Sequence, residues 1–155
     1  IEGDATIAST FLASGVYKNY QPGSAQIIKA RDVFREFLAI RNSSTLFRMR
    51  TAAEIQSRLK FYNTGSTQEA TVIAAHLDGT SYAGANYSDI VYVVNVDKQA
   101  HSVVIGSEAG KSYALHPVQA KSVDSVVKTS TFASGTGTFT VPARTVAVFV
   151  AANPS

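Results

Sequence analysis

Three histidines are the first residues to consider for acid–base or metal chemistry. His76 lies two residues before Asp78, His101 opens a later segment, and His116 precedes a proline. Side chains two residues apart in a strand share a face, so His76 and Asp78 are a candidate pair for a small hydrolase. Neither His-x-x-x-His nor His-Glu-x-x-His occurs, so the ligand spacing of zinc enzymes is absent. We therefore expect ordinary hydrogen-bonded histidines, no metal site and no cofactor.

Nucleophile and phosphate motifs are also missing. Ala133-Ser134-Gly135 lacks the leading glycine of Gly-x-Ser-x-Gly, and no P-loop or Gly-x-Gly-x-x-Gly opens a helix. Glycoside hydrolysis needs two acids on either side of a cleft. The 11 acidic residues are scattered, and the sequence favours no pair among them. We therefore predict no catalytic residue in this chain.

Aromatic platforms for sugars are the remaining possibility, because flat rings pack on the apolar faces of pyranoses. Tryptophan, the usual platform residue, is absent, but seven tyrosines are present. Tyr82 and Tyr87 lie in one Gly/Ala/Asn-rich segment and are the best candidate pair for carbohydrate binding. The alternative is that both rings are half-buried packing residues.

Composition limits the class of protein. The chain has 155 residues, 45% of them apolar and 16% charged, with no cysteine. This is one domain's length, too apolar for disorder, and without a disulfide scaffold or thiolate zinc site. No apolar run approaches the ~20 residues that span a bilayer. Because residue 1 is isoleucine, we expect a mature product or a piece of a longer protein. Localisation stays open, with secretion or a periplasmic location as one option.

Basic residues are concentrated in one segment. Between Lys29 and Lys60 there are eight basic and three acidic residues. The segment has neither a clustered basic run nor the aromatic residues of an RNA-binding sheet. A solvated helix face, or one that meets an acidic neighbour in a larger protein, explains it better. We expect neither nucleic acid nor a membrane as a partner.

The predicted elements are one helix followed by strands. Residues 1–24 read as a lead-in loop punctuated by glycine and proline. Ser24 is a plausible cap for an amphipathic helix over 25–41, on which Ile27, Phe34, Phe37, Leu38 and Arg41 share a face. Strands are predicted over these residues: 56–63, 71–77, 89–96, 101–105, 113–115, 126–132, 138–141 and 145–151. The pattern predicts a mainly β chain, an antiparallel β-sandwich of about seven strands preceded by one α-helix.

Four segments carry a family resemblance in matching order and spacing. Residues 34–47 read F-R-E-F-L-A-I-R-N-S-S-T-L-F and 58–65 read R-L-K-F-Y-N-T-G, while 89–95 read D-I-V-Y-V-V-N and 141–149 read V-P-A-R-T-V-A-V-F. They resemble F-x-x-L-x-x-L-R-x-S-S-P-L-F, R-V-x-F-x-N-T-G, D-G-I-V-V-x-x-N and L-P-A-x-S-V-A-V-L of pullulanase-type members of the α-amylase superfamily. The match runs from about residue 30 to the end. Thr45 replaces the usual proline in a connector.

The resemblance implies part of an enzyme that hydrolyses α-1,6-glucosidic bonds in pullulan, starch or glycogen. It implies that 25–47 complete a catalytic barrel preceding this chain and that 48–155 form a C-terminal β-sandwich domain. The nucleophile, acid/base and stabilising carboxylates of the family lie in that barrel, so none is placed here. We therefore expect a non-catalytic domain that supports the stability of the barrel of a debranching enzyme. The expected partner is that barrel, and α-glucan would be contacted only indirectly.

Two alternatives remain at this point. A stand-alone carbohydrate-binding module of sandwich fold would use Tyr82 and Tyr87, although the lack of tryptophan counts against it. A small hydrolase would use His76 and Asp78. If no barrel covers the helix, its apolar face should be covered by residues 1–24 or by a second copy in a homodimer.

Overall fold

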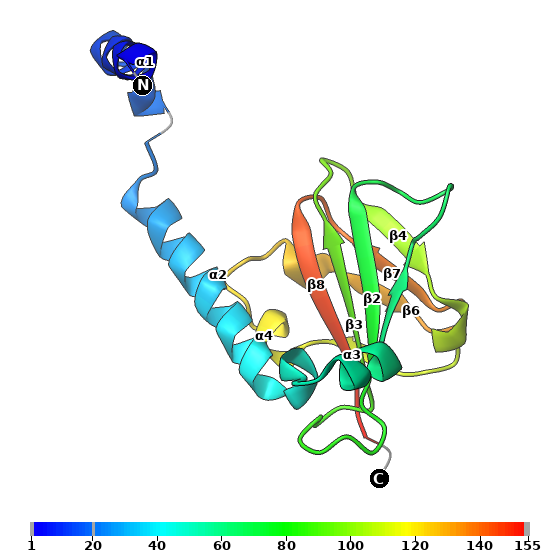
Figure 1. Ribbon diagram of the computed structural model, residues 1–155. Helices are drawn as coiled ribbons and strands as arrows, with labels where there is room; N and C mark the ends of the chain where they lie inside the picture. The colour runs from blue at the N-terminus through cyan, green and yellow to red at the C-terminus, as the bar shows by residue number, and fades with distance from the viewer. Residues whose placement is uncertain (1, 20, 154–155) are drawn as a thin grey trace. The chain divides into compact units, whose positions relative to one another are not determined.

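The computed structural model describes residues 2–19 and 21–153 (Figure 1). The chain divides into two compact units, Ile1–Asp32 and Val33–Ser155. None of the described helices combines the length and apolarity needed to cross a bilayer.

The first unit contains helix where a loop was expected. Helix α1 spans Glu2–Ser14 and the 3-10 turn η1 spans Val16–Asn19, before α2 begins at Ser24. The lead-in loop predicted over 1–24 is therefore wrong for most of its length. Three alanines and no proline lie between residues 4 and 14, which favours helix. Gly15 has φ of +70°, so it marks the end of the helix rather than a loop.

The second unit is an antiparallel β-sandwich, which confirms the predicted fold class. Its strands are β1 Leu59–Tyr62, β2 Val72–Asp78, β3 Asp89–Asn95, β4 His101–Val104, β5 Tyr113–Leu115, β6 Thr131–Ala133, β7 Thr138–Val141 and β8 Thr145–Ala151. They form a five-stranded sheet in the order β1-β2-β3-β8-β5 and a three-stranded sheet in the order β4-β7-β6 (Figure 1).

One long helix precedes these strands, and short helices and turns connect them. They are α2 Ser24–Ser43, η2 Thr45–Arg48, α3 Ala52–Arg58, η3 Gly106–Glu108, α4 Pro117–Ala120 and η4 Val127–Thr129. Thr51 caps α3 in a reciprocal capping box with Glu54, and this drives the helix through Arg58. The strand predicted from residue 56 consequently starts only at Leu59. The strand predicted over 126–132 is wrong at its start, where Val126 and Asp124 support η4 instead.

Strand β3 lies at the centre of the larger sheet, as its apolar sequence predicts. It pairs with β2 and with β8 along its whole length, so that Val93 lies between Ala74 and Ala147. Alternate residues then face two different cores. Val91 and Val93 face the space between the sheets, whereas Ile90 and Tyr92 face outward.

The inter-sheet core is aromatic at its centre. Phe139 of β7 packs its ring at 5.2, 4.5 and 5.1 Å from the rings of Tyr113, Phe132 and Phe149. Phe139 and Phe149 are both buried. Burying such rings removes a large apolar area from water, which is the main stabilising contribution of a sandwich.

A second core lies on the outer face of the five-stranded sheet. Ile40 of α2 and Leu46 of η2 pack there with Leu77, Ile90 and Val148. Polar bonds fix the same end of α2. The carboxylate of Glu36 accepts from the Ser122 hydroxyl at 2.6 Å and from the Val123 amide at 2.9 Å. Residues 33–47 therefore pack as part of the sandwich unit.

Candidate functional site

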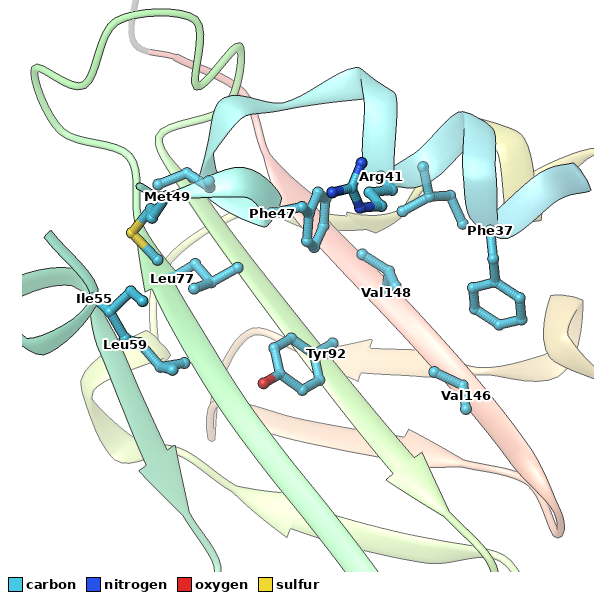
Figure 2. A pocket seen from close by; sticks show the side chains of 12 residues that line it. Phe37, Arg41, Phe47, Met49, Ile55, Leu59, Leu77, Tyr92, Val146 and Val148 are labelled. Carbon is cyan, nitrogen blue, oxygen red and sulfur yellow. The ribbon is translucent and has the colours of Figure 1, made fainter. Parts of the chain in front are cut away.

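An apolar groove opens between α2 and the outer face of the five-stranded sheet. Its volume is about 440 Å³. It is lined by Phe37, Ile40, Arg41, Leu46, Phe47, Met49, Ile55, Leu59, Leu77, Tyr92, Val146 and Val148. Figure 2 shows Phe37 and Arg41 on the helix side and Tyr92, Val146 and Val148 on the strands. We call this feature the α2 groove.

The periodicity of each element places these side chains in the α2 groove. Phe37 and Arg41 are four residues apart on α2 and therefore share a face. Val146 and Val148 are two residues apart on β8, so both side chains point to the outer face of the sheet. Tyr92 of β3 is the register partner of Val148. Sheet and helix thus present apolar walls to one space, and apolar walls favour an apolar occupant over water.

Arg41 is the only charged side chain among the residues that line the groove. Within residues 2–19 and 21–153, its guanidinium makes no hydrogen bond or ion pair. Two acids of the surrounding sequence are engaged elsewhere: Glu36 binds Ser122 and Val123, and Glu54 binds Thr51. The groove therefore carries an exposed positive charge that no described side chain pairs.

Tyr92 adds a second polar group to the groove floor. Burial raises the pKa of its phenol, so the hydroxyl stays protonated and remains both a donor and an acceptor. In the described part of the chain the hydroxyl makes no hydrogen bond. An occupant of the groove can therefore meet two polar groups in an otherwise apolar wall.

A separate polar cluster closes one end of the inter-sheet core. The ammonium of Lys111 lies 2.9 Å from Asp89 Oδ1 and 2.8 Å from Glu108 Oε2. His76 Nε2 lies 2.8 Å from the same oxygen of Asp89. The candidate pair of His76 with Asp78 is thus not formed, because Asp78 instead accepts from the Thr80 amide.

The electrostatics of this cluster favour ionised carboxylates. The bond from His76, followed by that from Lys111, holds the pKa of Asp89 well below its usual range despite burial. Burial acts to raise the pKa of Glu108, but bonds from Lys111 and Tyr113 outweigh it and lower that pKa. His76, Asp89 and Glu108 offer ligand atoms within 4.8 Å of one another, a set that would suit a cation. The Lys111 ammonium supplies the positive charge between the two carboxylates.

The two candidate sugar-binding tyrosines have different partners. The Tyr82 hydroxyl donates to Glu54 Oε1 at 3.1 Å, and the guanidinium of Arg58 lies 4.6 Å from its ring centre. The Tyr87 ring meets His116 edge-on at 5.7 Å. Both rings are half-buried against the outer core. Carbohydrate binding by this pair stays a prediction.

The other two histidines hold local structure. His116 is buried, its Nδ1 accepts from the Val118 amide at 3.2 Å, and its Nε2 lies 3.0 Å from Ser43 Oγ. Because Nδ1 accepts, Nε2 carries the proton, and burial lowers the pKa of the ring. His101 Nε2 lies 2.7 Å from Asp97 Oδ2.

Sequence reasoning did not identify the α2 groove. The available signal was Arg41, a charged residue on the apolar stripe of the predicted helix. Such a residue is unusual on a buried face and points to a partner for its charge. Tyr92 and Phe47 gave no comparable signal, because apolar and aromatic residues are expected in any core.

Comparison with known proteins relates the whole sandwich to one enzyme class. Residues 7–152 match the family described as alpha-1,6-glucosidases, pullulanase-type, C-terminal. The chain is 38% identical over 139 residues to pullulanase 1, chloroplastic, of Arabidopsis thaliana, covering 85% of this chain and 14% of that protein. It is 28% identical over 129 residues to the pullulanase of Klebsiella pneumoniae, covering 82% of this chain and 12% of that protein.

Solved structures agree with the sequence relatives. The crystal structure of PulA from Klebsiella oxytoca superimposes with a TM-score of 0.74 at 25% identity, over 86% of this chain and 13% of that one. The maltotriose complex of PulA from Klebsiella pneumoniae gives the same TM-score and identity over 86% of this chain and 15% of that one. The chain thus spans about one seventh of the length of these relatives.

Proposed function

The chain belongs to the family of C-terminal domains of pullulanase-type alpha-1,6-glucosidases, and we propose that it serves as the non-catalytic domain of a longer debranching hydrolase. In that role it stabilises a catalytic barrel that precedes it in the same polypeptide. The reaction of the whole polypeptide would be hydrolysis of α-1,6-glucosidic bonds in α-glucans such as pullulan, starch or glycogen.

The state of the clustered carboxylates supports a non-catalytic role. A glycosidase needs one carboxyl group whose pKa is raised, so that it can donate a proton to the leaving oxygen. Asp89 and Glu108 share one cation, the Lys111 ammonium, and the pKa of each is lowered. Both are therefore suited to structural ion pairs rather than to proton donation.

The observation that carries the supporting role is the uncovered apolar surface at α2. Phe34 is 63% exposed and Leu38 is 50% exposed, next to the open α2 groove. Exposed apolar side chains gathered on one face indicate an interaction surface. A preceding barrel in the same polypeptide would cover that face at no cost in translational entropy.

Hydrolysis of pullulan tests this proposal. The longer polypeptide that contains the chain should release reducing sugar, and the isolated 155-residue chain should release none, because proximity and acid–base catalysis both require the barrel. A preparation of the isolated chain that keeps its activity through repurification, against an empty-vector control, would contradict the proposal. So would a longer polypeptide without activity on any branched α-glucan.

Binding of α-glucan by Tyr82 and Tyr87 is tested separately. Affinity electrophoresis of the isolated chain in gels containing pullulan should show retardation if either ring is a platform, and Tyr82→Ala should remove it. Mobility that is independent of pullulan would limit both tyrosines to packing.

A further inference from the structure

We propose that the α2 groove seats a segment of the preceding polypeptide that brings apolar side chains and one carboxylate, and that this carboxylate pairs with Arg41. The inference rests on the proposed function, because it identifies the surface through which the domain meets the rest of the enzyme. It adds the chemistry that the opposite surface must have.

The walls of the groove specify the apolar part of the occupant. Phe37 on α2 and Ile55 on α3 line the groove from different elements, and their side chains remain 36% and 40% exposed. The volume of about 440 Å³ accommodates several apolar side chains. Filling it would remove both residues from water, which is favourable in proportion to the apolar area covered.

Arg41 specifies the polar part. Its guanidinium offers five donors, none of which is used within the described residues. An occupant without an acceptor would leave this charge buried and unpaired, which is strongly unfavourable. A carboxylate satisfies it with two parallel hydrogen bonds. The hydroxyl of Tyr92, which lines the same groove, can bind a further polar atom of the same segment.

Charge favours the preceding polypeptide over a second copy of this chain. Arg48 and Arg50 follow Arg41 and are exposed, whereas Glu36 and Glu54 are engaged in internal hydrogen bonds. A two-fold dimer through the groove would bring these basic patches towards each other. The relatives are about seven times longer than the chain that they match, and in a C-terminal domain the additional polypeptide lies before it.

Thiol labelling measures whether the groove is occupied. The chain contains no cysteine, so an introduced thiol within it reports one position, which peptide mass mapping identifies. Ile55→Cys probes the groove, and Val104→Cys, 64% exposed on the other sheet, is the matched control. Ile55→Cys should react at least about tenfold more slowly in the longer polypeptide than in the isolated chain. Val104→Cys should react equally in both.

Charge reversal measures the pairing. In the longer polypeptide, Arg41→Glu should lower the unfolding midpoint by at least about 2–4 °C, and 1 M NaCl should reduce the difference between variant and wild type. Arg41→Lys should retain part of the effect. Arg48 is an exposed arginine outside the groove lining, so Arg48→Glu should change neither the unfolding midpoint nor its dependence on salt. In the isolated chain, Arg41→Glu should match wild type, because no partner is lost.

Each result has a distinct meaning. Equal labelling of Ile55→Cys in both proteins would show an open groove and overturn the inference, while pullulan hydrolysis by the longer polypeptide would leave the proposed function intact. Protection together with equal effects of Arg41→Glu and Arg48→Glu would overturn the carboxylate pairing. Concentration-dependent dimerisation of the isolated chain by light scattering, abolished by Phe37→Ser and accompanied by protection of Ile55→Cys, would assign the groove to a second copy and overturn the inference as well.

Discussion

Val93 provides the sharpest test of the sandwich itself. Its side chain is 0% exposed and lies in the inter-sheet core between Ala74 and Ala147 of the two neighbouring strands. Val93→Asp replaces two methyl groups by a carboxyl of similar size, so packing volume changes little. The effect is therefore almost entirely one of polarity.

The expected loss of stability follows from three contributions. Losing the burial of valine costs about 1.5–3 kcal/mol, and burying a neutral carboxyl without a hydrogen bond costs roughly 1–3 kcal/mol. The carboxyl must also stay protonated in the fold, and from an unfolded pKa of ~3.9 this costs about 4 kcal/mol at pH 7. The total, about 6–10 kcal/mol, lies within the ~5–15 kcal/mol stability of a whole domain. We expect Val93→Asp to be largely unfolded at pH 7.

Urea denaturation followed by circular dichroism measures this loss, with Val104→Asp as the control. Val104 is 64% exposed on β4, so the same substitution should shift the free energy of unfolding by less than about 0.5 kcal/mol. A buried aspartate has a raised pKa, so its penalty is largest above ~3.9 and shrinks as pH falls. The difference in free energy of unfolding between Val93→Asp and Val104→Asp should decrease by up to about 4 kcal/mol when the pH is lowered from 7 to 4. A Val93→Asp variant as stable as Val104→Asp at pH 7 would refute the central position of β3.

Two ionisable sites give further expectations. The lowered pKa values of Asp89 and Glu108 stabilise the fold above the unfolded values of ~4, and this stability is lost as pH falls through the folded values. Lys111→Met should destabilise by roughly 1–3 kcal/mol at pH 7, because two carboxylates lose their bonds; denaturation showing no loss would refute the cluster. The lowered pKa of His116 gives stability that is present above ~6.5 and declines as pH falls below it. His116→Gln should flatten that decline in urea melts between pH 7 and 5; a decline as steep as that of the wild type would contradict a buried neutral ring.

The predictable part of the fold was the part governed by local periodicity. The strands near 72–78, 89–95 and 145–151 were expected from apolar runs, and the central place of 89–95 from its two apolar faces. The prediction of a loop over residues 1–24 was wrong because glycines at the two ends of a helix cannot be distinguished, in sequence, from glycines within a loop. The strand predicted at η4 was wrong because Val126 and Val127 have a strand propensity that local hydrogen bonds override.

The candidate site was harder to predict because it depends on contacts between distant segments. Lys111 meets Asp89 across 22 residues of sequence, and His116 meets Ser43 across 73. No spacing rule connects such pairs. The α2 groove likewise arises where the end of α2, the connector that follows it, helix α3 and four strands converge. Only the position of Arg41 on an apolar stripe could have pointed to it in advance.

We propose that this domain supports a catalytic barrel that precedes it in the same polypeptide. The most direct measurement is the thermal inactivation of pullulan hydrolysis by the longer polypeptide, compared with a version that ends after Phe47. That version retains α2 and removes the sandwich beneath it. We predict that it loses activity at a temperature several degrees lower, or is not recovered as active enzyme. Equal inactivation temperatures and equal activity in the two proteins would contradict the supporting role.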